Sequence, residues 1–459
     1  MKGERALRSH AREIWEAALA AVDPAEAVRK HVRRRGDRLV VDGQNYDLAA
    51  YDRVWVVGAG KAAAAMGQSL EKTLGPRLGG GILVTKYGHS LPLQRTELLE
   101  AGHPLPDANG AAAGERIARF ITERIGAQDL VFCLLSGGGS ALMTSPAPGL
   151  SLQDKLICTQ LLLDSGATIR EMNALRKHLS AVKGGGLARL LGQRPAVSLI
   201  LSDVVGDRLD TIASGPLVPD GTTYAECLEI LRRRRIADRV PPAVLHRIRE
   251  GAAGRIAETP KPGDPIFRGK QNIIVGSNAQ ACSAAARCAA RLGYRAAVLT
   301  SSGEGDTRES ALFHISIARE AASFGRPLRP PACLISGGET TVQIQGKGLG
   351  GRNQEFALHC VRPLAEIAVP CLVASIGTDG TDGPTDAAGA VAVRTSLARA
   401  LQQDPRLLDH SIENNDSYHF FQRLGDLIIT GPTRTNVMDL RIILIGPPPP
   451  APGKRRGMR

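Results

Sequence analysis

Short apolar runs that end in glycine alternate with segments of helical periodicity from Tyr51 onward, and this alternation constrains the fold most strongly. The run DRVWVVGAG leads into KAAAAMGQSLEKTLG, and GGILVTKYG, QDLVFCLLSGGGS and AVSLILSDVVGD are further runs of the same kind. This strand–glycine–helix order is typical of a mainly parallel, doubly wound sheet. The sequence therefore predicts an α/β protein.

The alternation is interrupted between residues 236 and 270, where the chain is irregular and holds several prolines. We interpret this segment as the connection between two domains, because the alternation restarts at NIIVGSN and continues to DLRIILIG. A length of 459 residues also favours two domains. The prediction is a Rossmann-like, doubly wound N-terminal domain over residues 1–250 and a smaller α/β C-terminal domain over residues 251–459.

Composition excludes several classes of protein. The chain is 43% hydrophobic and 22% charged, as in ordinary globular proteins, and no apolar stretch approaches the roughly 20 residues that cross a bilayer. The N-terminus is a charged amphipathic segment without a signal-peptide core. The eight cysteines form no C-x-x-C pair, and Cys133, Cys333 and Cys371 fall in apolar runs, which predicts buried thiols in a reducing compartment. We expect a cytoplasmic protein without a membrane partner.

The formal charge of +13 raises the question of nucleic-acid binding. Aromatic residues are only 3% of the chain and are not interleaved with the basic ones, as base stacking would require. We therefore expect no nucleic-acid partner and interpret the basic excess as a solvated surface, or one that attracts small anions. The proline-rich tail PPPPAPGKRRGMR is predicted to be disordered.

Ligands of open α/β sheets bind outside the carboxyl ends of the strands, so the loops after the apolar runs are the candidate site. Five of these loops are rich in glycine, serine and aspartate, namely residues 58–61, 136–140, 202–207, 336–340 and 377–386.

The first loop matches a dinucleotide-binding pattern, G-x-G-x-x-[GA], through Gly58 and Gly60. The following apolar run ends on Lys86, however, where a ribose-binding site needs an acidic residue. An anion site is the alternative, with backbone N–H groups at a helix start and Lys61 directed at the same place. Lys61 could also be a solvated lysine of the first turn.

The second loop is Ser136, Gly137, Gly138, Gly139 and Ser140, directly after the run VFCLL. Three glycines let the backbone approach a ligand closely, and successive N–H groups can form an anion nest. A plain tight turn is the alternative. No G-x-x-x-x-G-K-[ST] pattern occurs, which excludes a P-loop.

Acidic residues follow two other runs. Asp203 and Asp207 bracket the turn after VSLIL, where a carboxylate suits general-base work or Mg²⁺ binding, although Asp203 could instead cap the turn. Asp379 and Asp382 lie in a loop that lacks the closing glutamate of an EF-hand. These four aspartates are the candidate metal ligands, and the last two could equally shape a turn.

Arg352 stands at the start of a probable helix, after two glycines. Arginine is unfavourable at a helix N-terminus unless it meets an anion, such as a carboxylate or a phosphate, which its planar group can bind through two hydrogen bonds. An exposed arginine without a ligand is the alternative.

Twelve segments, in order along nearly the whole chain, resemble the glycerate 2-kinase family, whose C-terminal half is the MOFRL domain. They are VVGAGKAAAAMG, AGHPLPDANG, LLSGGGSALM, NALRKHLSAVKGGGLA, SLILSDVVGD, IASGPLVPD, VGSNAQA, LISGGETTV, GLGGRNQEFAL, GTDGTDGPTDAAGA, NNDSY and TGPTRTNVMDLRI. Twelve segments in a fixed order are far more specific than any one of them.

The resemblance implies ATP-dependent phosphorylation of D-glycerate, typically at the 2-hydroxyl, with Mg²⁺, in a cleft between two α/β domains. The family's catalytic lysine, aspartate and arginine fall on Lys61, Asp203 and Arg352, and the lysine and the arginine would also bind the substrate. The glycines of the first loop and the whole second loop would hold the nucleotide or a phosphate.

Two positions depart from the family's pattern. Gly186 stands where the family usually has arginine, and Arg434 stands where it usually has glycine. These changes leave anion affinity and substrate preference open.

An NAD(P)-dependent hydroxypyruvate reductase is the alternative function. The position phosphorylated, the domain that holds the adenine and the oligomeric state, a homodimer being one option, also stay open.

Overall fold

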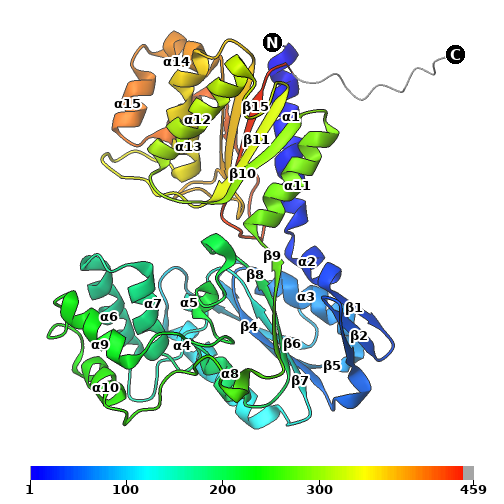
Figure 1. Cartoon of the computed structure of the whole chain (residues 1–459), viewed down its shortest axis with the longest axis vertical. Coiled ribbons are helices and arrows are strands. Elements are labelled where there is room, and N and C mark those ends of the chain that lie inside the picture. The colour runs from blue at the N-terminus through cyan, green and yellow to red at the C-terminus, as the bar shows by residue number, and fades with distance from the viewer. Residues whose placement is uncertain (1, 448–459) are drawn as a thin grey trace. The chain divides into compact units, whose positions relative to one another are not determined.

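A computed structural model describes residues 2–447, and its contacts divide the chain into two compact units (Figure 1). The larger unit is Pro24–Val275, and the other joins Met1–Asp23 to Gly276–Arg459. The predicted disordered tail lies outside the described residues from position 448 onward.

The larger unit is built on a six-stranded sheet in the order β6-β5-β4-β7-β8-β9. Numbered from the first of these strands in the chain, this order is the Rossmann order 3-2-1-4-5-6. The pairs β4–β5, β5–β6, β4–β7 and β7–β8 are parallel, so the predicted doubly wound sheet is confirmed. The strands are β4 (Val54–Ala59), β5 (Leu78–Lys86), β6 (Thr96–Ala101), β7 (Leu130–Leu135), β8 (Ala196–Leu201) and β9 (Lys270–Gly276).

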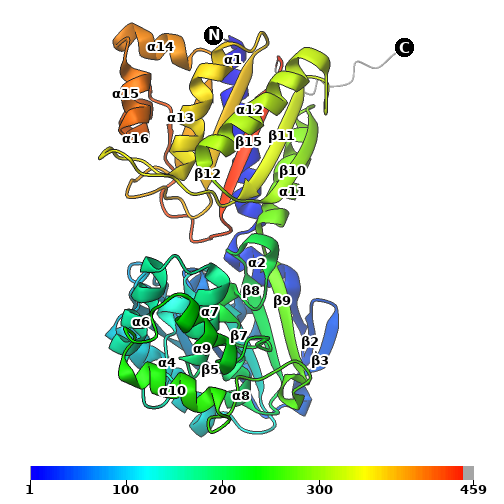
Figure 2. The ribbon, with the colours of Figure 1, turned by 60° about the vertical axis from the view of Figure 1, so that its left-hand side comes forward.

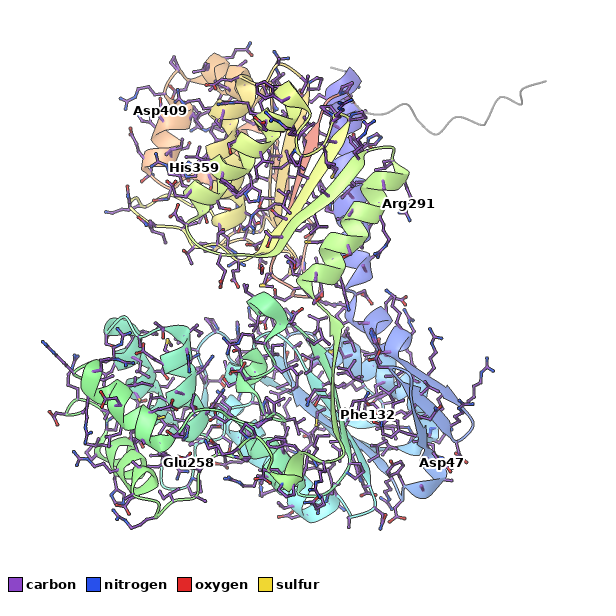
Figure 3. All side chains as sticks on the ribbon, in the orientation of Figure 1. Asp47, Phe132, Glu258, Arg291, His359 and Asp409 are labelled. Carbon is purple, nitrogen blue, oxygen red and sulfur yellow. The ribbon has the colours of Figure 1, made fainter. Side chains whose placement is uncertain are left out.

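Helices cover this sheet because its central strands are apolar on both faces. Every residue of β4, β7 and β8 is buried, including Phe132 in the middle of β7 (Figure 3). Ile117 and Ile121, one turn apart, pack against the sheet from α4. The helices next to this sheet are α3 (Ala63–Leu74), α4 (Ala108–Arg124), α5 (Gly139–Leu142) and α8 (Gly186–Leu191).

Four helices of the larger unit pack around an apolar cluster of their own. Three of them begin with a capping box, Ser151 with Asp154 being the first, which satisfies the free N–H groups of their first turns. The four are α6 (Leu152–Asp164), α7 (Ile169–His178), α9 (Tyr224–Arg233) and α10 (Pro242–Ala252).

The segment 236–270 is not a connection between domains, so this interpretation was wrong. It holds α10 and then leads into β9, and both lie inside the larger unit. The prolines that suggested a linker partly serve α10, which begins at Pro242, where the missing N–H does no harm. Before the sheet, the same unit holds α2 (Pro24–His31) and a small antiparallel sheet of β1 (Val32–Arg35), β2 (Arg38–Val41) and β3 (Gln44–Asp47).

The other unit has a six-stranded sheet in the order β10-β11-β15-β12-β13-β14. Only β10 and β11 are parallel, and the other pairs are antiparallel, so this sheet is mixed. The strands are β10 (Arg295–Gly303), β11 (Ala332–Gly338), β12 (Cys371–Gly377), β13 (Gly389–Val393), β14 (Leu427–Ile428) and β15 (Asp439–Ile445).

Helices lie on both faces of this mixed sheet (Figures 1 and 2). The pair α1 and α11 packs together on one face, and α12 packs against α13 on the other. The helices of this unit are α1 (Lys2–Ala21), α11 (Asn278–Arg291), α12 (Thr307–Phe324), α13 (Arg352–Ala365), α14 (Ser396–Gln403), α15 (Leu407–Glu413) and α16 (Ser417–Leu424).

The division into units differs from the predicted boundaries in two places. The first helix, α1, packs on the C-terminal part of the chain, because its apolar stripe, which includes Leu7 and Ile14, is buried there. His10 Nδ1 lies 2.9 Å from Tyr294 Oη, which fixes the same contact through a hydrogen bond. The second difference is the point of division, which falls after Val275 rather than after residue 250.

All eight cysteines are buried and unpaired, which confirms the predicted buried thiols. Within residues 2–447, none of the helices has the length and apolar character needed to span a bilayer.

Candidate active site

The loops after β4 and β7 meet at the point where the strand order of the larger unit reverses. The N–H of Lys61 donates to the carbonyl of Gly137 (2.9 Å), and the N–H of Ala62 donates to Oγ of Ser136 (3.0 Å). Ligands of doubly wound sheets bind at this reversal. The structure thus places the predicted lysine beside the predicted glycine-rich loop.

Gly58 and Gly60 are required by packing. Both have positive φ, and a Cβ would lie 2.0 Å from the carbonyl oxygen of Leu134 at Gly58 and 2.0 Å from Oγ of Ser136 at Gly60. A side chain at either position would push β4 and its loop away from β7. The dinucleotide-like pattern is therefore explained without a dinucleotide.

The backbone N–H groups at the start of α3 are already bonded within the protein. Those of Gly60, Lys61 and Ala63 donate to backbone carbonyls, and that of Ala62 donates to a serine hydroxyl. An anion cradle made of these N–H groups is thus not present. The half-buried side chain of Lys61 is what this loop can offer to an anion.

The loop Ser136–Ser140 is tied to two other segments of the larger unit. Oγ of Ser140 lies 2.5 Å from Oγ of Ser214, and the ammonium of Lys183 donates to the carbonyl of Ser140 (2.7 Å). Gly138 has φ of 84°, and a Cβ there would lie 2.9 Å from the ring of His103, so the loop turns sharply at a position that suits glycine.

Asp203 follows β8, the neighbour of β7, at the same edge of the parallel sheet. The turn that follows Asp203 has Val204 as its N-cap residue, without a side-chain capping bond from that valine. The segment behind it is strained, since Asp207, Ala213 and Ser214 all have positive φ. Non-glycine residues in this conformation gather at functional sites.

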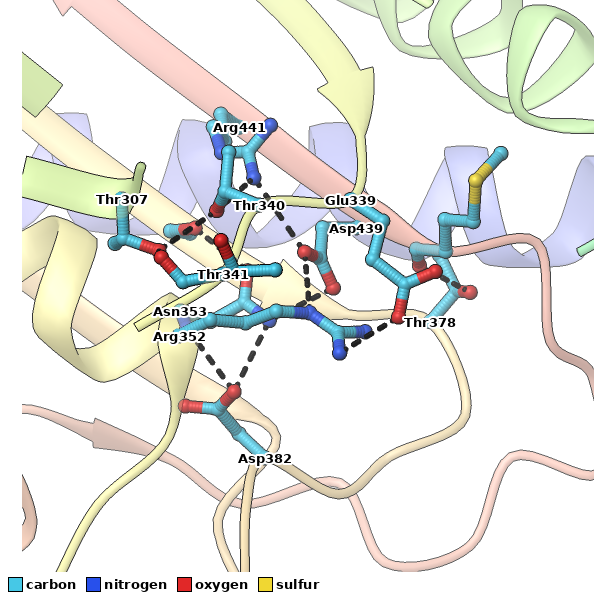
Figure 4. Close-up of polar contacts among 12 residues, drawn as sticks. Thr307, Glu339, Thr340, Thr341, Arg352, Asn353, Thr378, Asp382, Asp439 and Arg441 are labelled. Atoms are coloured by element: carbon cyan, nitrogen blue, oxygen red, sulfur yellow. Dashed lines mark hydrogen bonds and ion pairs between the residues drawn. The ribbon is translucent and has the colours of Figure 1, made fainter. Parts of the chain in front are cut away.

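Arg352 begins α13 in the other unit and meets two carboxylates (Figure 4). Its Nε donates to Oδ2 of Asp439 (2.7 Å), and its Nη1 lies 2.8 Å from Oε1 of Glu339. Burial opposes its charge, but Asp439, Glu339 and Asp382 outweigh burial and raise the pKa of Arg352. The anions that this arginine meets within the unit are the protein's own.

Asp382 caps α13. Its Oδ1 accepts from the N–H of Asn353 (3.0 Å), and its Oδ2 accepts from the N–H of Gln354 (2.8 Å) and from the amide of that side chain (3.0 Å). Burial raises the pKa of Asp382 to about 6, against the effect of these bonds. Both oxygens are thus engaged, which gives this metal candidate a capping role.

The four metal candidates are divided between the two units. Asp203 and Asp207 belong to the larger unit, whereas Asp379 and Asp382 belong to the other. Asp379 accepts from the N–H and the hydroxyl of Thr381 (3.2 and 3.1 Å), which is a turn-forming arrangement. Among the described residues, no group of three or more acidic, histidine or cysteine side chains could hold a metal ion.

Sequence reasoning missed Asp439 and Arg441, which lie at the start of β15. Both are buried, and Nη2 of Arg441 lies 3.4 Å from Oδ2 of Asp439, so this carboxylate faces two guanidinium groups. The signal was present as two charged residues in the run DLRIILIG. A buried charge in an apolar strand requires a partner.

Sequence reasoning also missed three cations that line a pocket beside the Ser136–Ser140 loop, namely Lys155, Arg176 and Lys183.

Comparison with known proteins covers almost the whole chain. Residues 10–249 match the family described as "Domain of unknown function (DUF4147)", and residues 332–439 match the MOFRL family. A protein of Pyrococcus horikoshii named glycerate 2-kinase is 41% identical, over 93% of this chain and 95% of its own. The chain belongs to the glycerate kinase family.

The fold is also similar to a crystal structure of glycerate kinase from Thermotoga maritima, with a TM-score of 0.84 at 39% sequence identity. This likeness within the glycerate kinase family covers 96% of this chain and 100% of that one. The fold and the enzyme class that the sequence predicts are thereby confirmed. A relative from Agrobacterium vitis, 41% identical over 95% of this chain and 94% of its own, carries a provisional hydroxypyruvate reductase name.

The two departures from the glycerate kinase pattern have different structural settings. Arg434 is exposed and has φ of 64°, which is the conformation that the family's usual glycine adopts without strain. Gly186 is buried at the start of α8, where a Cβ would lie 2.3 Å from the carbonyl oxygen of Ala181. In this chain the position does not admit a side chain unless the backbone moves.

Proposed function

We propose that this protein transfers the γ-phosphoryl group of ATP to the 2-hydroxyl of D-glycerate, giving 2-phosphoglycerate. The chain is about 40% identical to glycerate 2-kinases over more than nine-tenths of its length, and this identity carries the proposal. One of these relatives is 41% identical over 93% of the chain. Eight buried, unpaired cysteines fit a reducing compartment, and we place the reaction in the cytoplasm.

Phosphoryl transfer requires charge neutralisation and positioning more than covalent chemistry, and the candidate residues suit that need. Lys61, at the reversal of the strand order, neutralises charge on the transferred group. Asp203 orients the attacking hydroxyl and accepts its proton. Arg352 binds the carboxylate or phosphate of the substrate, which would replace the exposed Glu339 at Nη1 while the buried Asp439 keeps hold of Nε.

The donor set fits Mg²⁺ that enters with the nucleotide. Magnesium takes oxygen ligands and is often bound through one or two carboxylates plus substrate phosphates. The described residues offer no cluster of three ligands, but Asp203 and Asp207 offer single carboxylates at the end of β8. When bound, the ion would neutralise charge on the phosphates, and Asp203 is the first candidate for its protein ligand.

An NAD(P)-dependent hydroxypyruvate reductase is the second candidate, favoured by the name of the Agrobacterium vitis relative. Two observations count against it. Gly58 and Gly60 are explained by strand packing, and β5 ends on Lys86, where a ribose-binding carboxylate would be needed.

One experiment separates the two candidates. Purified protein is given D-glycerate with ATP and Mg²⁺ in an assay for ADP, and, in parallel, hydroxypyruvate with NADH or NADPH in an assay for cofactor oxidation. We expect ADP formation that depends on D-glycerate and no cofactor oxidation. Cofactor oxidation without ADP formation would overturn the proposal.

A further inference from the structure

A pocket of about 660 Å³ lies in the larger unit, beside the loop Ser136–Ser140. Residues 103–106, the loop itself, α6 and the end of α7 line it. A pocket of this volume is in the range that holds small organic ligands. It is larger than a three-carbon acid requires.

Three cations and no carboxylate line this pocket. Lys155 and Lys183 are only 7% and 5% exposed, and the ammonium of Lys155 has no hydrogen-bond partner in the described part of the chain. None of Lys155, Arg176 and Lys183 forms an ion pair with any described residue. Buried charges without counter-ions are strongly unfavourable, so this cluster is built for an anion that the protein does not supply.

The electrostatics of the cluster point in the same direction. Burial, and then the charge of Arg176, lowers the pKa of Lys155 to about 7. Burial, together with Lys155 and Arg176, lowers the pKa of Lys183 well below its ordinary value. A ligand with several negative charges would relieve both burial and the mutual repulsion, as a polyphosphate does.

Much of the remaining lining of the pocket is apolar. Leu105, Ile157 and Leu163 line it and are 74%, 37% and 51% exposed, which is unusual for large apolar side chains. Leu152 and Leu156 of α6 continue this wall. A flat heterocyclic base would cover such a wall, whereas a small hydroxy acid would leave it in water.

We propose that this pocket binds the adenine nucleotide, with the phosphates on the three cations and the base on the leucine-rich wall. Gly138 and Ser140 belong to the lining, and the neighbouring Gly137 is bonded to the backbone of Lys61, so the phosphates would lead toward the catalytic lysine. The proposal rests on the proposed function, because it takes a nucleotide as one of the substrates.

Calorimetric titration of the full-length protein with ADP, without glycerate, tests this assignment. Lys155→Met removes the unpartnered charge at similar shape, and we expect it to weaken ADP binding more than about tenfold, since a hydrogen bond to a charged group is lost. Leu163→Gln, an exposed change in the wall, is expected to weaken ADP about threefold or more. Lys30→Met, an exposed lysine of α2 outside the pocket, is the matched control and is expected to leave the Kd unchanged.

Thermal unfolding separates loss of binding from loss of fold. Lys155→Met removes a buried, unpaired charge, so its unfolding temperature is expected to equal or exceed that of the natural protein while ADP binding falls. Wild-type ADP affinity in both pocket variants would overturn the proposal. So would a loss of D-glycerate or inorganic phosphate binding with ADP binding intact, which would make the pocket a small-anion site.

Proton uptake provides an independent readout. In the nucleotide-free protein at pH 8 the side-chain amine of Lys155 is mostly deprotonated, because its pKa is about 7. The nucleotide phosphates would raise this pKa, so binding takes up protons. The other charged or titratable lining groups are Arg176, Lys183 and His103. We expect the ADP binding enthalpy to depend on the buffer, and more weakly so in Lys155→Met. An equal buffer dependence in both proteins would contradict the role of Lys155.

The pocket assignment and the proposed function can fail separately. Should nucleotide binding behave as expected while D-glycerate is not phosphorylated, the proposed function fails and the pocket assignment stands.

Discussion

The carboxylate of Asp439, buried at the start of β15, accepts a hydrogen bond of 2.7 Å from Nε of Arg352 at the start of α13. Asn353, the next residue of the helix, donates to the other oxygen of the same carboxylate at 2.9 Å. The central strand of the mixed sheet therefore sets the position of the helix start and of the arginine. Arg352 is thus held from one side, and the more exposed Glu339 contacts it from another.

This geometry makes lysine a poor substitute for Arg352. Arg352→Lys keeps the charge but loses the planar group that can bind Asp439 and a substrate anion together, so we expect kcat/KM for D-glycerate to fall more than about tenfold. Arg362→Lys, an exposed arginine of the same helix that pairs with Asp409, is the control. Equal kcat/KM in the two variants would show that Arg352 does not bind the substrate.

Lys61→Ala is expected to lower kcat by about 10³-fold or more, because a cation that faces a transferred phosphoryl group stabilises its transition state. Folding should be nearly unaffected, since the backbone bond of Lys61 that ties the loop to Gly137 survives the substitution. Steady-state kinetics with Lys72→Ala, an exposed lysine of α3, as control provide the measurement. A variant with a tenth of the natural activity would exclude a catalytic role.

Asp203→Asn keeps the shape of the side chain and removes its charge. If Asp203 accepts the proton of the attacking hydroxyl, kcat falls by about 10²-fold or more while ATP·Mg²⁺ binding survives. Single-turnover kinetics and nucleotide titration of the same preparation measure the two effects. A matching collapse of ATP·Mg²⁺ affinity would instead make Asp203 a metal ligand.

Arg434→Gly is expected to stabilise the protein by about 1 kcal/mol, because arginine is strained at φ of 64° and glycine is not. Arg434 makes none of the hydrogen bonds or ion pairs found among the described residues, so nothing else is lost. Arg434→Ala keeps the strained backbone and is the control. Chemical unfolding provides the measurement, and a less stable glycine variant would contradict the argument.

The parallel sheet of the larger unit could be predicted because each strand is a buried apolar run followed by a glycine loop, as in DRVWVVGAG. The same rhythm did not reveal the mixed sheet. Its central strand, β15, comes last in the chain and lies antiparallel between β11 and β12. The order of apolar runs along the sequence does not tell in which direction each strand runs in the sheet. The docking of α1 on the far part of the chain is likewise a tertiary contact that no local pattern encodes.

For the candidate site, the strand-end loops of Lys61, Ser136 and Asp203 were predictable, since glycine, serine and aspartate stand where parallel strands end. Asp439 and Lys155 were not predicted, for different reasons. Asp439 is the first residue of a strand and does not follow one. Lys155 belongs to a helix, where a lysine between polar and apolar residues normally faces water, and only the fold buries it.

The position of phosphorylation is the central claim, and ³¹P NMR of the product tests it most directly. Protein, D-glycerate, ATP and Mg²⁺ are incubated until the substrate is consumed, and the proton-coupled spectrum is recorded. A phosphate on C2 couples to one proton and gives a doublet, whereas a phosphate on C3 couples to two and gives a triplet. We predict the doublet of 2-phosphoglycerate. A triplet would contradict transfer to the 2-hydroxyl, and the absence of any phosphomonoester signal would contradict the kinase activity itself.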